Sequence, residues 1–363
     1  MKVLSVIGTR PEAIKMAPVI RRLEADPEIE SRVVATAQHR EMLDAVIERF
    51  ELRIDADLDV MATDQPLARL TARLLRKLDP VLEAEAPELV LAQGDTTTVI
   101  CAALACFYRG IRFGHVEAGL RTHDVSSPFP EELNRTIVGR LATDHFAPTA
   151  AARDNLLAEG VDPGRVEITG NTVIDALLEV AAMDLPMDLP VHPSARVLLI
   201  TAHRRESLGA PMRAAFGALR ALADGYPDVQ LVFPVHPNPH VRALAHEVLG
   251  AHPRILLCAP LNYFDFVRLM KRSFFVVSDS GGIQEEAPAL GKPVLVLRDE
   301  TERTEAVAEG VVELVGTDPD RILSSARRLL DDAKAYAAMA RGVSPYGDGH
   351  AAQRIHAAIR RTL

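Results

Sequence analysis

Tryptophan is absent from this 363-residue sequence, aromatic residues make up only 4%, and there are three cysteines. Cys101, Cys106 and Cys258 lie in apolar runs without paired spacing, which argues against a disulfide framework and against a zinc site. We expect all three to be buried thiols. Apolar residues nevertheless account for 48% of the chain and charged residues for 25%, which is the balance of a globular protein with a large core and excludes a disordered chain.

Positive charge is also scarce. Lysine and arginine total 41 against 50 aspartate and glutamate residues, so the net charge of −9 argues against a nucleic-acid or anionic-membrane partner. Local basic groups would therefore have to hold any phosphate ligand. The apolar run Lys2–Ile7 meets Gly8 and is far too short for a signal peptide or a membrane span, so we expect a cytoplasmic protein.

Several cofactor motifs are missing. The sequence has no GxxxxGK[ST] loop, which disfavours a P-loop kinase, and no GxGxxG after a strand, which removes the usual NAD or FAD site. We therefore expect no cofactor. The segment Asp55–Asp59 has the D-x-D spacing that some sugar transferases use for a metal ion, but no nucleotide loop follows it. We interpret it as an exposed acidic segment and expect no metal.

The segments that are present form a βα repeat long enough for two domains. Short apolar runs with little alternation are typical of strands buried on both faces of a parallel sheet. The proline-interrupted stretch 185–194 predicts a linker between two such series, and two domains imply a cleft. The predicted strands are Lys2–Ile7, Arg32–Thr36, Leu89–Ala92, Arg112–Val116 and Val166–Thr169, then Val197–Thr201, Leu231–Val235, Ile255–Leu257, Phe274–Val277 and Val294–Leu297.

Ligands of open parallel sheets bind beyond the carboxyl ends of the strands, so the loops there are the candidates for chemistry. The loop Gly8–Glu12 follows the first strand. Its glycine, the free N–H groups of the next helix and the cations Arg10 and Lys15 suit an anion. An ordinary turn with solvated cations is an equally good interpretation at this point.

Carboxylates follow two later strands of the first half. Asp95 and Glu117 each come directly after a predicted strand, and Glu131 brings a third acid a little further along. Clustered carboxylates raise one another's pKa and supply general acids and bases. Each of these acids alone is more simply explained as a helix cap or a solvated side chain.

The second half carries the more specific phosphate signal. Ser278–Ala287 follows a predicted strand, and its paired glycines at a helix start would let a diphosphate approach backbone N–H groups. Glu286, one turn further, would accept from both ribose hydroxyls. The cluster Ala202–Ser207 suits an anion about as well as a solvated turn does, and the prolines around His236 favour a plain turn.

Taken together, these motifs resemble those of the bacterial non-hydrolysing UDP-N-acetylglucosamine 2-epimerases, which share the two-domain fold of the GT-B glycosyltransferases. The match runs nearly end to end. It rests on Gly8–Met16, Gly94–Thr98, Gly114–Thr122, Gly170–Leu177, His203–Glu206, Asp279–Pro288 and Pro345–Gly349. The resemblance implies an α/β protein with two Rossmann-like, doubly wound domains facing a cleft. Residues 1–184 would form the first domain, with 350–363 packing back on it, and residues 195–349 the UDP-binding domain.

The resemblance also implies roles for individual residues. The implied catalytic residues are Asp95, Glu117, Glu131 and His203. The implied substrate-binding residues are Arg10, Lys15, Asp95, Glu117, His203, Leu261, Phe266, Ser280, Gly281, Gly282, Glu286 and Arg303. Leu261 stands where some members carry a polar residue, so only a backbone contact to uracil is implied there.

Some members are activated by their own substrate at a second, allosteric site. Gln38, Arg205 and His236 match residues of that site. Asp64 stands where some members offer a basic residue, which weakens the expectation of substrate activation. The resemblance further implies a homodimer.

The chemistry explains why such residues are needed. The C2 hydrogen of a pyranose is not acidic, because no neighbouring carbonyl stabilises a carbanion, and the sequence shows no NAD site for an oxidation route. The family eliminates UDP and adds it back. One carboxylate removes the C2 proton, another acid returns it on the opposite face, and cations with helix N–H groups stabilise departing UDP. Base and acid stay unassigned among Asp95, Glu117 and Glu131.

The function expected from the resemblance is reversible C2 epimerisation of UDP-N-acetylglucosamine to UDP-N-acetylmannosamine, which supplies a precursor for surface polysaccharide. The alternatives are a hydrolysing 2-epimerase, a 2-epimerase of a modified UDP-sugar, and a GT-B glycosyltransferase, which would require an acceptor. A nucleotide-sugar-binding regulator that has lost catalysis is a further alternative. The three acids and His203 speak against it.

Overall fold

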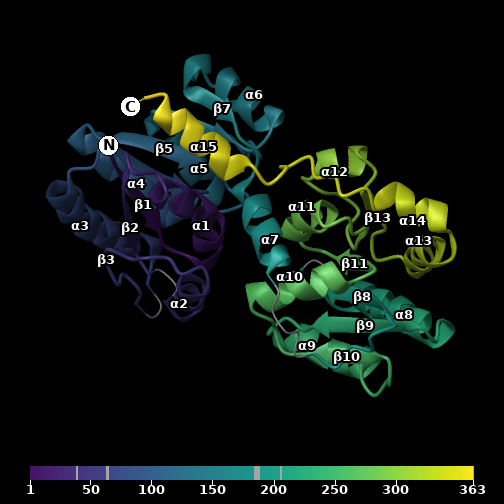
Figure 1. Cartoon of the computed structure of the whole chain (residues 1–363). Coiled ribbons are helices and arrows are strands. Elements are labelled where there is room, and N and C mark those ends of the chain that lie inside the picture. The colour runs from purple at the N-terminus through teal and green to yellow at the C-terminus, as the bar shows by residue number, and fades with distance from the viewer. Residues whose placement is uncertain (38–39, 63–64, 184–188, 205–206, 363) are drawn as a thin grey trace. The chain divides into compact units, whose positions relative to one another are not determined.

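The computed structural model describes residues 1–37, 40–62, 65–183, 189–204 and 207–362. The chain divides into two compact units, which are described separately here (Figure 1). Unit 1 comprises Met1–Ala176 with Tyr346–Leu363, and unit 2 comprises Leu177–Pro345. Each is a parallel sheet with connecting helices, which confirms the predicted α/β class with two Rossmann-like sheets.

The sheet of unit 1 has seven strands in the order β3-β2-β1-β4-β5-β6-β7. The strands are β1 (Lys2–Ile7), β2 (Glu30–Ala35), β3 (Ala56–Asp57), β4 (Leu89–Gln93), β5 (Arg112–Val116), β6 (Asp144–Ala147) and β7 (Val166–Ile168). The helices are α1 (Arg10–Glu24), α2 (Arg40–Arg49), α3 (Leu67–Glu85), α4 (Thr97–Arg109), α5 (Glu131–Leu141), α6 (Ala150–Ala158), the short 3₁₀ helix η1 (Pro163–Arg165), α7 (Thr172–Ala182), whose second half belongs to unit 2, and α15 (Ala351–Arg360).

Unit 2 contains a six-stranded sheet in the order β10-β9-β8-β11-β12-β13. Its strands are β8 (Arg196–Thr201), β9 (Val229–Pro234), β10 (Ile255–Cys258), β11 (Phe275–Ser278), β12 (Val294–Val296) and β13 (Val312–Leu314). Its helices are α8 (Ala210–Gly225), α9 (Pro239–Leu249), α10 (Tyr263–Arg272), α11 (Gly281–Ala289), α12 (Thr304–Ala308), α13 (Pro319–Asp331) and α14 (Ala333–Met339).

The strand order of each sheet reverses at one place. In unit 1 the reversal lies between β1 and β4, and in unit 2 it lies between β8 and β11. Ligands of doubly wound sheets bind beyond the carboxyl ends of the strands at such a switch point, because the loops there diverge to opposite faces. In both units, motifs singled out in the sequence follow these switch-point strands.

The central strands form because their apolar residues are buried on both faces. All five residues of β4 are buried, and so are five of the six residues of β1. The sequence prediction missed three strands, β3, β6 and β13. β6 begins with Asp144 and His145, whose polar character hides a strand in which His145 is nevertheless buried. β3 has only two residues, and the charged Glu313 interrupts the apolar run of β13.

The C-terminal helix α15 packs against α1 in unit 1 (Figure 1, yellow). The Asp175 carboxylate accepts hydrogen bonds from the N–H groups of Ala351 and Ala352, at 3.1 and 2.9 Å, and so caps the start of α15. At its other end, Arg360 donates to Asp26 at 2.8 Å. The units divide within α7, upstream of 185–194. The linker stays a prediction, because residues 184–188 lie outside the described ranges.

None of the helices in the described ranges is both long enough and apolar enough to cross a membrane. Cys101 and Cys106 are free and buried, as predicted, whereas Cys258 is free but only half-buried.

Candidate active site

The first loop of the unit 1 switch point is packed tightly. Gly8 directly follows β1, and a Cβ atom added there would come within 2.6 Å of the Thr36 hydroxyl and closer still to Thr98 Oγ1. These two hydroxyls are hydrogen-bonded to each other at 3.0 Å. The chain therefore needs glycine at this position because the loops that follow β1, β2 and β4 meet there.

Two N–H groups just before α1 already have an acceptor. The N–H groups of Gly8 and Thr9 are not free for an anion, because they donate to Glu12 Oε2 at 2.5 and 2.9 Å. The Glu12 carboxylate therefore lies at the start of α1 and binds these two N–H groups. Arg10, half-buried at the first position of α1, and Lys15, one turn further along, remain the cationic groups of the loop.

Lys15 and Glu117 form an ion pair at this edge of the sheet. Lys15 Nζ lies 2.6 Å from Glu117 Oε2, and the Glu117 side chain is only 9% exposed. Gln93, at the end of β4, also donates to the same oxygen. Glu117 has a left-handed backbone, with φ of 65°, which is strained for a residue with a side chain. Such strain at a charged residue beside a switch point is typical of functional sites.

Two side chains of α5 donate hydrogen bonds to Asp95. Arg135 NH2 donates to Asp95 Oδ2 at 2.7 Å, and Asn134 Nδ2 donates to the Asp95 carbonyl at 2.8 Å. Burial raises the pKa of the Asp95 carboxyl, and the positive charge of Arg135 opposes this shift. The negative charges of Glu117 and Glu131 raise the pKa further, so the three predicted acids are close enough to interact. A carboxyl group with a raised pKa is suited to exchange protons near neutral pH.

The peptide group before Asp95 is fixed by a buried histidine. His115 Nε2 lies 2.7 Å from the Gly94 carbonyl, which can only accept, so the ring donates from Nε2. Burial lowers the His115 pKa to about 3, and the imidazole is therefore neutral. This histidine is a rigid support and not a proton carrier.

Glu131, the first residue of α5, completes the group of acids. Its Oε2 atom is buried and has no hydrogen-bond partner among the described residues. A buried carboxylate oxygen without a donor is costly, so its presence beside Asp95 and Glu117 favours a role toward a ligand.

In unit 2, the switch point brings His203 against Asp279. His203 Nδ1 lies 2.8 Å from Asp279 Oδ1, and the N–H groups of His203 and Arg204 donate to Oδ2 at 2.7 and 2.8 Å. Burial by itself would raise the Asp279 pKa, but the hydrogen bonds from His203 and Arg204 outweigh it, so the pKa is lowered. Asp279 therefore fixes the ring of His203 and leaves the Nε2 edge for another partner.

The start of α11 follows β11 directly. Ser280 is the N-cap residue and makes no side-chain cap, and a Cβ atom at Gly282 would meet open space. A Cβ atom at Gly281, in contrast, would approach Arg303 to within 3.3 Å. Backbone N–H groups at a helix start beside an arginine form an anion-binding arrangement.

The other four predicted UDP residues lie on or beside α10, α11 and α12. Glu286, buried on α11, accepts a hydrogen bond from Tyr263 at 3.3 Å. Arg303 is bound through Nε to Glu285 Oε1 at 2.8 Å. Phe266 on α10 is half-buried, as is Leu261 just before the same helix.

The predicted allosteric residues are described only in part. Gln38, Arg205 and Asp64 lie outside the described residues. The exposed His236 lies after β9, with its ring centre 5.7 Å from that of His203.

Comparison with known proteins identifies the family. Residues 21–360 match the sequence model of UDP-N-acetylglucosamine 2-epimerase. The chain is 50% identical over 370 residues to the UDP-N-acetylglucosamine 2-epimerase of Escherichia coli K12, a match that covers 99% of this chain and 98% of that protein. The chain belongs to the UDP-N-acetylglucosamine 2-epimerase family.

Solved structures agree with this family assignment. A UDP-N-acetylglucosamine 2-epimerase homologue from Listeria monocytogenes is 48% identical with a TM-score of 0.94, over 99% of this chain and 96% of that one. The Neisseria meningitidis UDP-GlcNAc 2-epimerase bound to UDP-GlcNAc is 45% identical with a TM-score of 0.87, over 99% of this chain and all (100%) of that chain.

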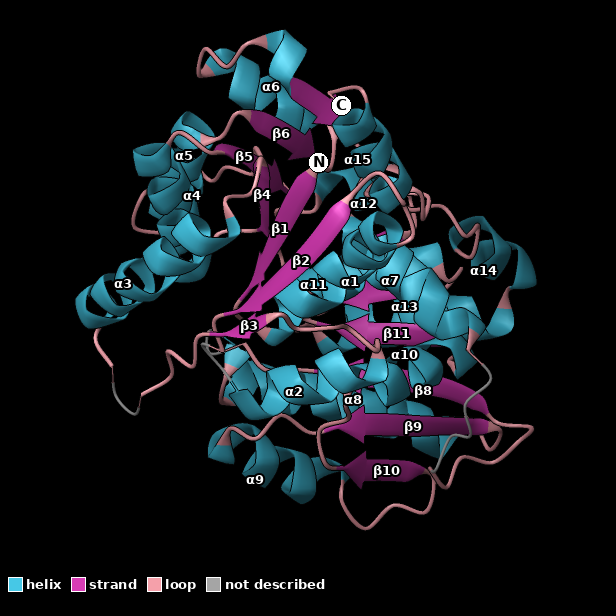
Figure 2. Ribbon diagram, turned by 60° about the vertical axis from the view of Figure 1, so that its left-hand side comes forward, coloured by secondary structure: helices cyan, strands magenta, loops and turns pink. Residues whose placement is uncertain are grey.

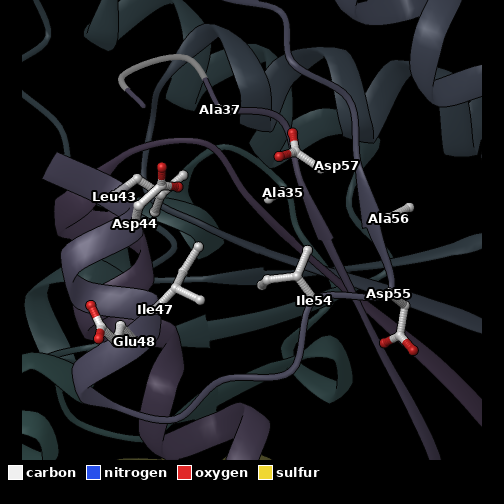
Figure 3. A pocket seen from close by; sticks show the side chains of 10 residues that line it. All are labelled: Ala35, Ala37, Leu43, Asp44, Ile47, Glu48, Ile54, Asp55, Ala56 and Asp57. Carbon is white, nitrogen blue, oxygen red and sulfur yellow. The ribbon is translucent and has the colours of Figure 1, made fainter. Parts of the chain in front are cut away.

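None of the residues that line a cavity of about 390 Å³ in unit 1 is a predicted site residue (Figure 3). Carboxylates of Asp44, Glu48 and Asp57 surround it, and Figure 3 shows Asp55 at its lower edge. The interpretation of the 55–59 segment as wholly exposed is wrong, because Asp55 is bound to Arg32 at 2.9 Å with its side chain only 10% exposed. Within the described ranges, no group of histidine, cysteine, aspartate and glutamate residues is arranged to hold a metal ion.

The sequence analysis overlooked residues whose partners are distant in the chain. Arg135 binds Asp95, and Tyr263 donates to Glu286. A weak signal exists for Arg135, which follows Glu131 by one helical turn and so shares its face of α5. No local signal marks Tyr263, because its hydroxyl meets a helix that begins only after another strand.

Proposed function

We propose that this protein epimerises UDP-N-acetylglucosamine at C2, reversibly and without hydrolysis, to give UDP-N-acetylmannosamine. The observation that supports this most directly is the group of acids in unit 1, with Asp95 and Glu117 each bound to a cation at the switch point. Family membership narrows the substrate class, and the Neisseria relative is bound to UDP-GlcNAc.

The proposed reaction proceeds by elimination and re-addition of UDP. One carboxyl group of unit 1 removes the C2 proton while the bond between C1 and the UDP oxygen breaks. A second acid returns a proton to the opposite face as UDP adds back. The raised pKa of Asp95 suits either task, because a carboxyl group titrating nearer neutrality both accepts and releases protons. Arg10 and Lys15 would stabilise negative charge on departing UDP.

Unit 2 supplies the UDP contacts in this proposal. The start of α11 would bind the diphosphate through the N–H groups of Ser280, Gly281 and Gly282, and Glu286 would accept from the ribose hydroxyls. Phe266, Arg303 and the backbone at Leu261 would complete the nucleotide site, with His203 directed at the sugar-phosphate. The acids belong to unit 1 and the proposed UDP loop belongs to unit 2.

We also propose a homodimer that uses an apolar surface of unit 1. Helices α4 and α5 pack side by side, as Figure 2 shows. Their exposed side chains include Phe107 at 62%, Tyr108 at 71%, Leu133 at 41% and Ile137 at 37%. Monomeric proteins seldom expose a large contiguous apolar patch, so a second copy of this chain is the occupant that we propose.

The product of the proposed reaction, UDP-N-acetylmannosamine, would supply a precursor for surface polysaccharide.

Incubation with UDP-N-acetylglucosamine alone, followed by NMR of the products, tests the function. We expect UDP-N-acetylmannosamine with deuterium at C2 when the solvent is deuterated water. An ¹⁸O label in the C1–O–P bridge should scramble into non-bridging oxygens of the β-phosphate, because elimination frees that oxygen. Accumulation of free N-acetylmannosamine would identify a hydrolysing enzyme instead. Retention of the C2 hydrogen with an unscrambled bridge would contradict elimination.

A further inference from the structure

Glu12 is a buried acid that the proposed reaction does not use. Its side chain is on α1, the residue is 2% exposed, and it accepts three hydrogen bonds. Burial raises its pKa to about 7 even though these hydrogen bonds favour the charged form. Burying a carboxylate in this way costs folding free energy, so a capping role alone does not explain it.

The third hydrogen bond is the unusual one. A capping box requires only that the glutamate accept from the backbone N–H of the N-cap residue, here Thr9. Glu12 Oε1 also accepts from Thr96 Oγ1 at 2.5 Å, a contact between residues 84 positions apart in the chain. Thr96 directly follows Asp95, so this bond connects α1 to the loop that carries the first candidate acid.

Lys15 makes the corresponding contact to the neighbouring strand. Residues three apart on a helix share a face, so Glu12 and Lys15 project from the same side of α1. Glu12 reaches the loop after β4, and Lys15 reaches Glu117 after β5 at 2.6 Å. The two strands are adjacent in the sheet, with Gln93 opposite Val116. One helix face therefore holds the loops of both acids.

We propose that Glu12 is a positioning residue, which fixes Asp95 with respect to Glu117 by binding the Thr96 hydroxyl. This inference rests on the proposed function. Proton removal and return on opposite faces of one carbon demand two acids at a set separation, and a shift of about 1 Å can cost a hundredfold in rate. The Glu12–Thr96 bond secures one acid, and the Lys15–Glu117 pair secures the other.

Threonine 96 provides the cleanest test, because Thr96→Val keeps the side-chain shape and removes only the hydroxyl. We expect kcat to fall about tenfold or more, with KM and the UDP dissociation constant changed by less than about twofold, because neither Thr96 nor Glu12 is among the UDP contacts that we propose. The isotope effect with C2-deuterated substrate should increase, since misplacing Asp95 slows proton transfer. Thr96→Ser restores the hydroxyl and should recover the parent kcat.

Glu12→Gln should behave like Thr96→Val, because an amide cannot accept all three hydrogen bonds. The double variant should be no slower than Glu12→Gln alone if both act through one contact. Asp26→Asn is the matched control: it removes a buried carboxylate just beyond the other end of α1, where Asp26 binds Arg360. We expect a lower Tm with kcat and the isotope effect unchanged.

Several outcomes would overturn the inference. These are a folded Thr96→Val protein with parent kcat and isotope effect, a rise in KM alone, or an Asp26→Asn protein with the same kinetic defect. If the unsubstituted protein shows no epimerase activity, the proposed function fails, and crystal structures then decide the inference separately. The Asp95 carboxylate should move away from Arg135 in Thr96→Val, and an unmoved carboxylate at the parent distance of 2.7 Å would refute it.

Discussion

The switch points of the two sheets carry different kinds of groups. In unit 1 the strand-end side chains are charged and bound to one another, as in the pairs Lys15–Glu117 and Arg135–Asp95. At the start of α11 in unit 2, the residues are a serine and two glycines that offer backbone N–H groups. Unit 1 therefore presents two acid–cation pairs near its switch point, whereas unit 2 combines the single His203–Asp279 pair with a helix start.

This contrast indicates a division of work. Proton transfer needs carboxyl groups with shifted pKa values, and burial among other charges produces that shift for Asp95. Holding a diphosphate needs backbone N–H groups that do not titrate, which α11 offers. The surfaces differ as well, because most of the large apolar side chains exposed in the described ranges belong to unit 1.

The largest effect is expected from Asp95→Asn. The change removes a group that we expect to transfer a proton, so kcat should fall about a hundredfold or more. The hydrogen bond from Asn134 should persist, because it goes to the backbone carbonyl of residue 95. UDP affinity, measured by calorimetry, should stay the same, because Asp95 is not among the UDP contacts that we propose. Glu24→Gln, an exposed change on α1, is the control and should retain activity. A folded Asp95→Asn protein with the turnover of the parent would contradict the proposal that unit 1 carries out proton transfer.

Glu286→Ala should show the opposite profile. Loss of an acceptor for the ribose hydroxyls should weaken UDP binding about tenfold or more, which corresponds to about 1.4 kcal/mol. Tyr263→Phe should have a smaller effect, because it removes only the hydroxyl that donates to Glu286 at 3.3 Å. Calorimetry with UDP measures both. Equal affinities of parent and Glu286→Ala would show that UDP is not bound at α11.

The surface difference predicts which unit forms the dimer. An arginine at Leu133, which is 41% exposed on α5, would place a charge in the proposed apolar interface and should convert the dimer to a monomer. Val343→Arg is the matched control, since Val343 is also 41% exposed but lies in unit 2. Light scattering coupled to size-exclusion chromatography reports the mass. A dimer that survives the change at Leu133 would place the interface elsewhere.

The last expected effect concerns acid stability. Burial lowers the pKa of His115 to about 3 and of His145 to about 4, from 6.5. Below pH 6.5 the unfolded chain therefore binds protons that the folded chain does not, so stability falls as the pH falls from 6.5 toward 4. For His145 alone the loss approaches about 3 kcal/mol by pH 4.

Glu12 has the opposite effect on the pH dependence of stability. Its raised pKa of about 7 contributes stability that is present below pH 4.5 and is lost as the pH rises toward 7. His145→Asn isolates the histidine contribution, because it leaves Glu12 unchanged. Urea unfolding at several pH values should give a shallower acid loss for this variant than for the parent. Parallel curves would mean that His145 is not held neutral by the fold.

Local patterns in the sequence determined the α/β class, most of the strands and the loops that end them. Strands buried on both faces need continuous apolar runs, and polar residues directly after such runs mark the loops. The motifs then pointed to the family, and comparison with known proteins confirmed it. The roles of Asp95, Glu117, Glu131 and His203 stay predictions.

Only the tertiary structure decided which groups bind one another. Lys15 and Glu117 are 102 residues apart, and Arg135 and Asp95 are 40 apart, so no local pattern predicts either pair. Glu12 accepts from the N–H groups of Gly8 and Thr9 just before α1, and α15 returns to α1 from the far end of the chain. These contacts follow from the strand order, which places β4 beside both β1 and β5. Local propensity does not encode that order, because it arises from the packing of whole βα units against each other.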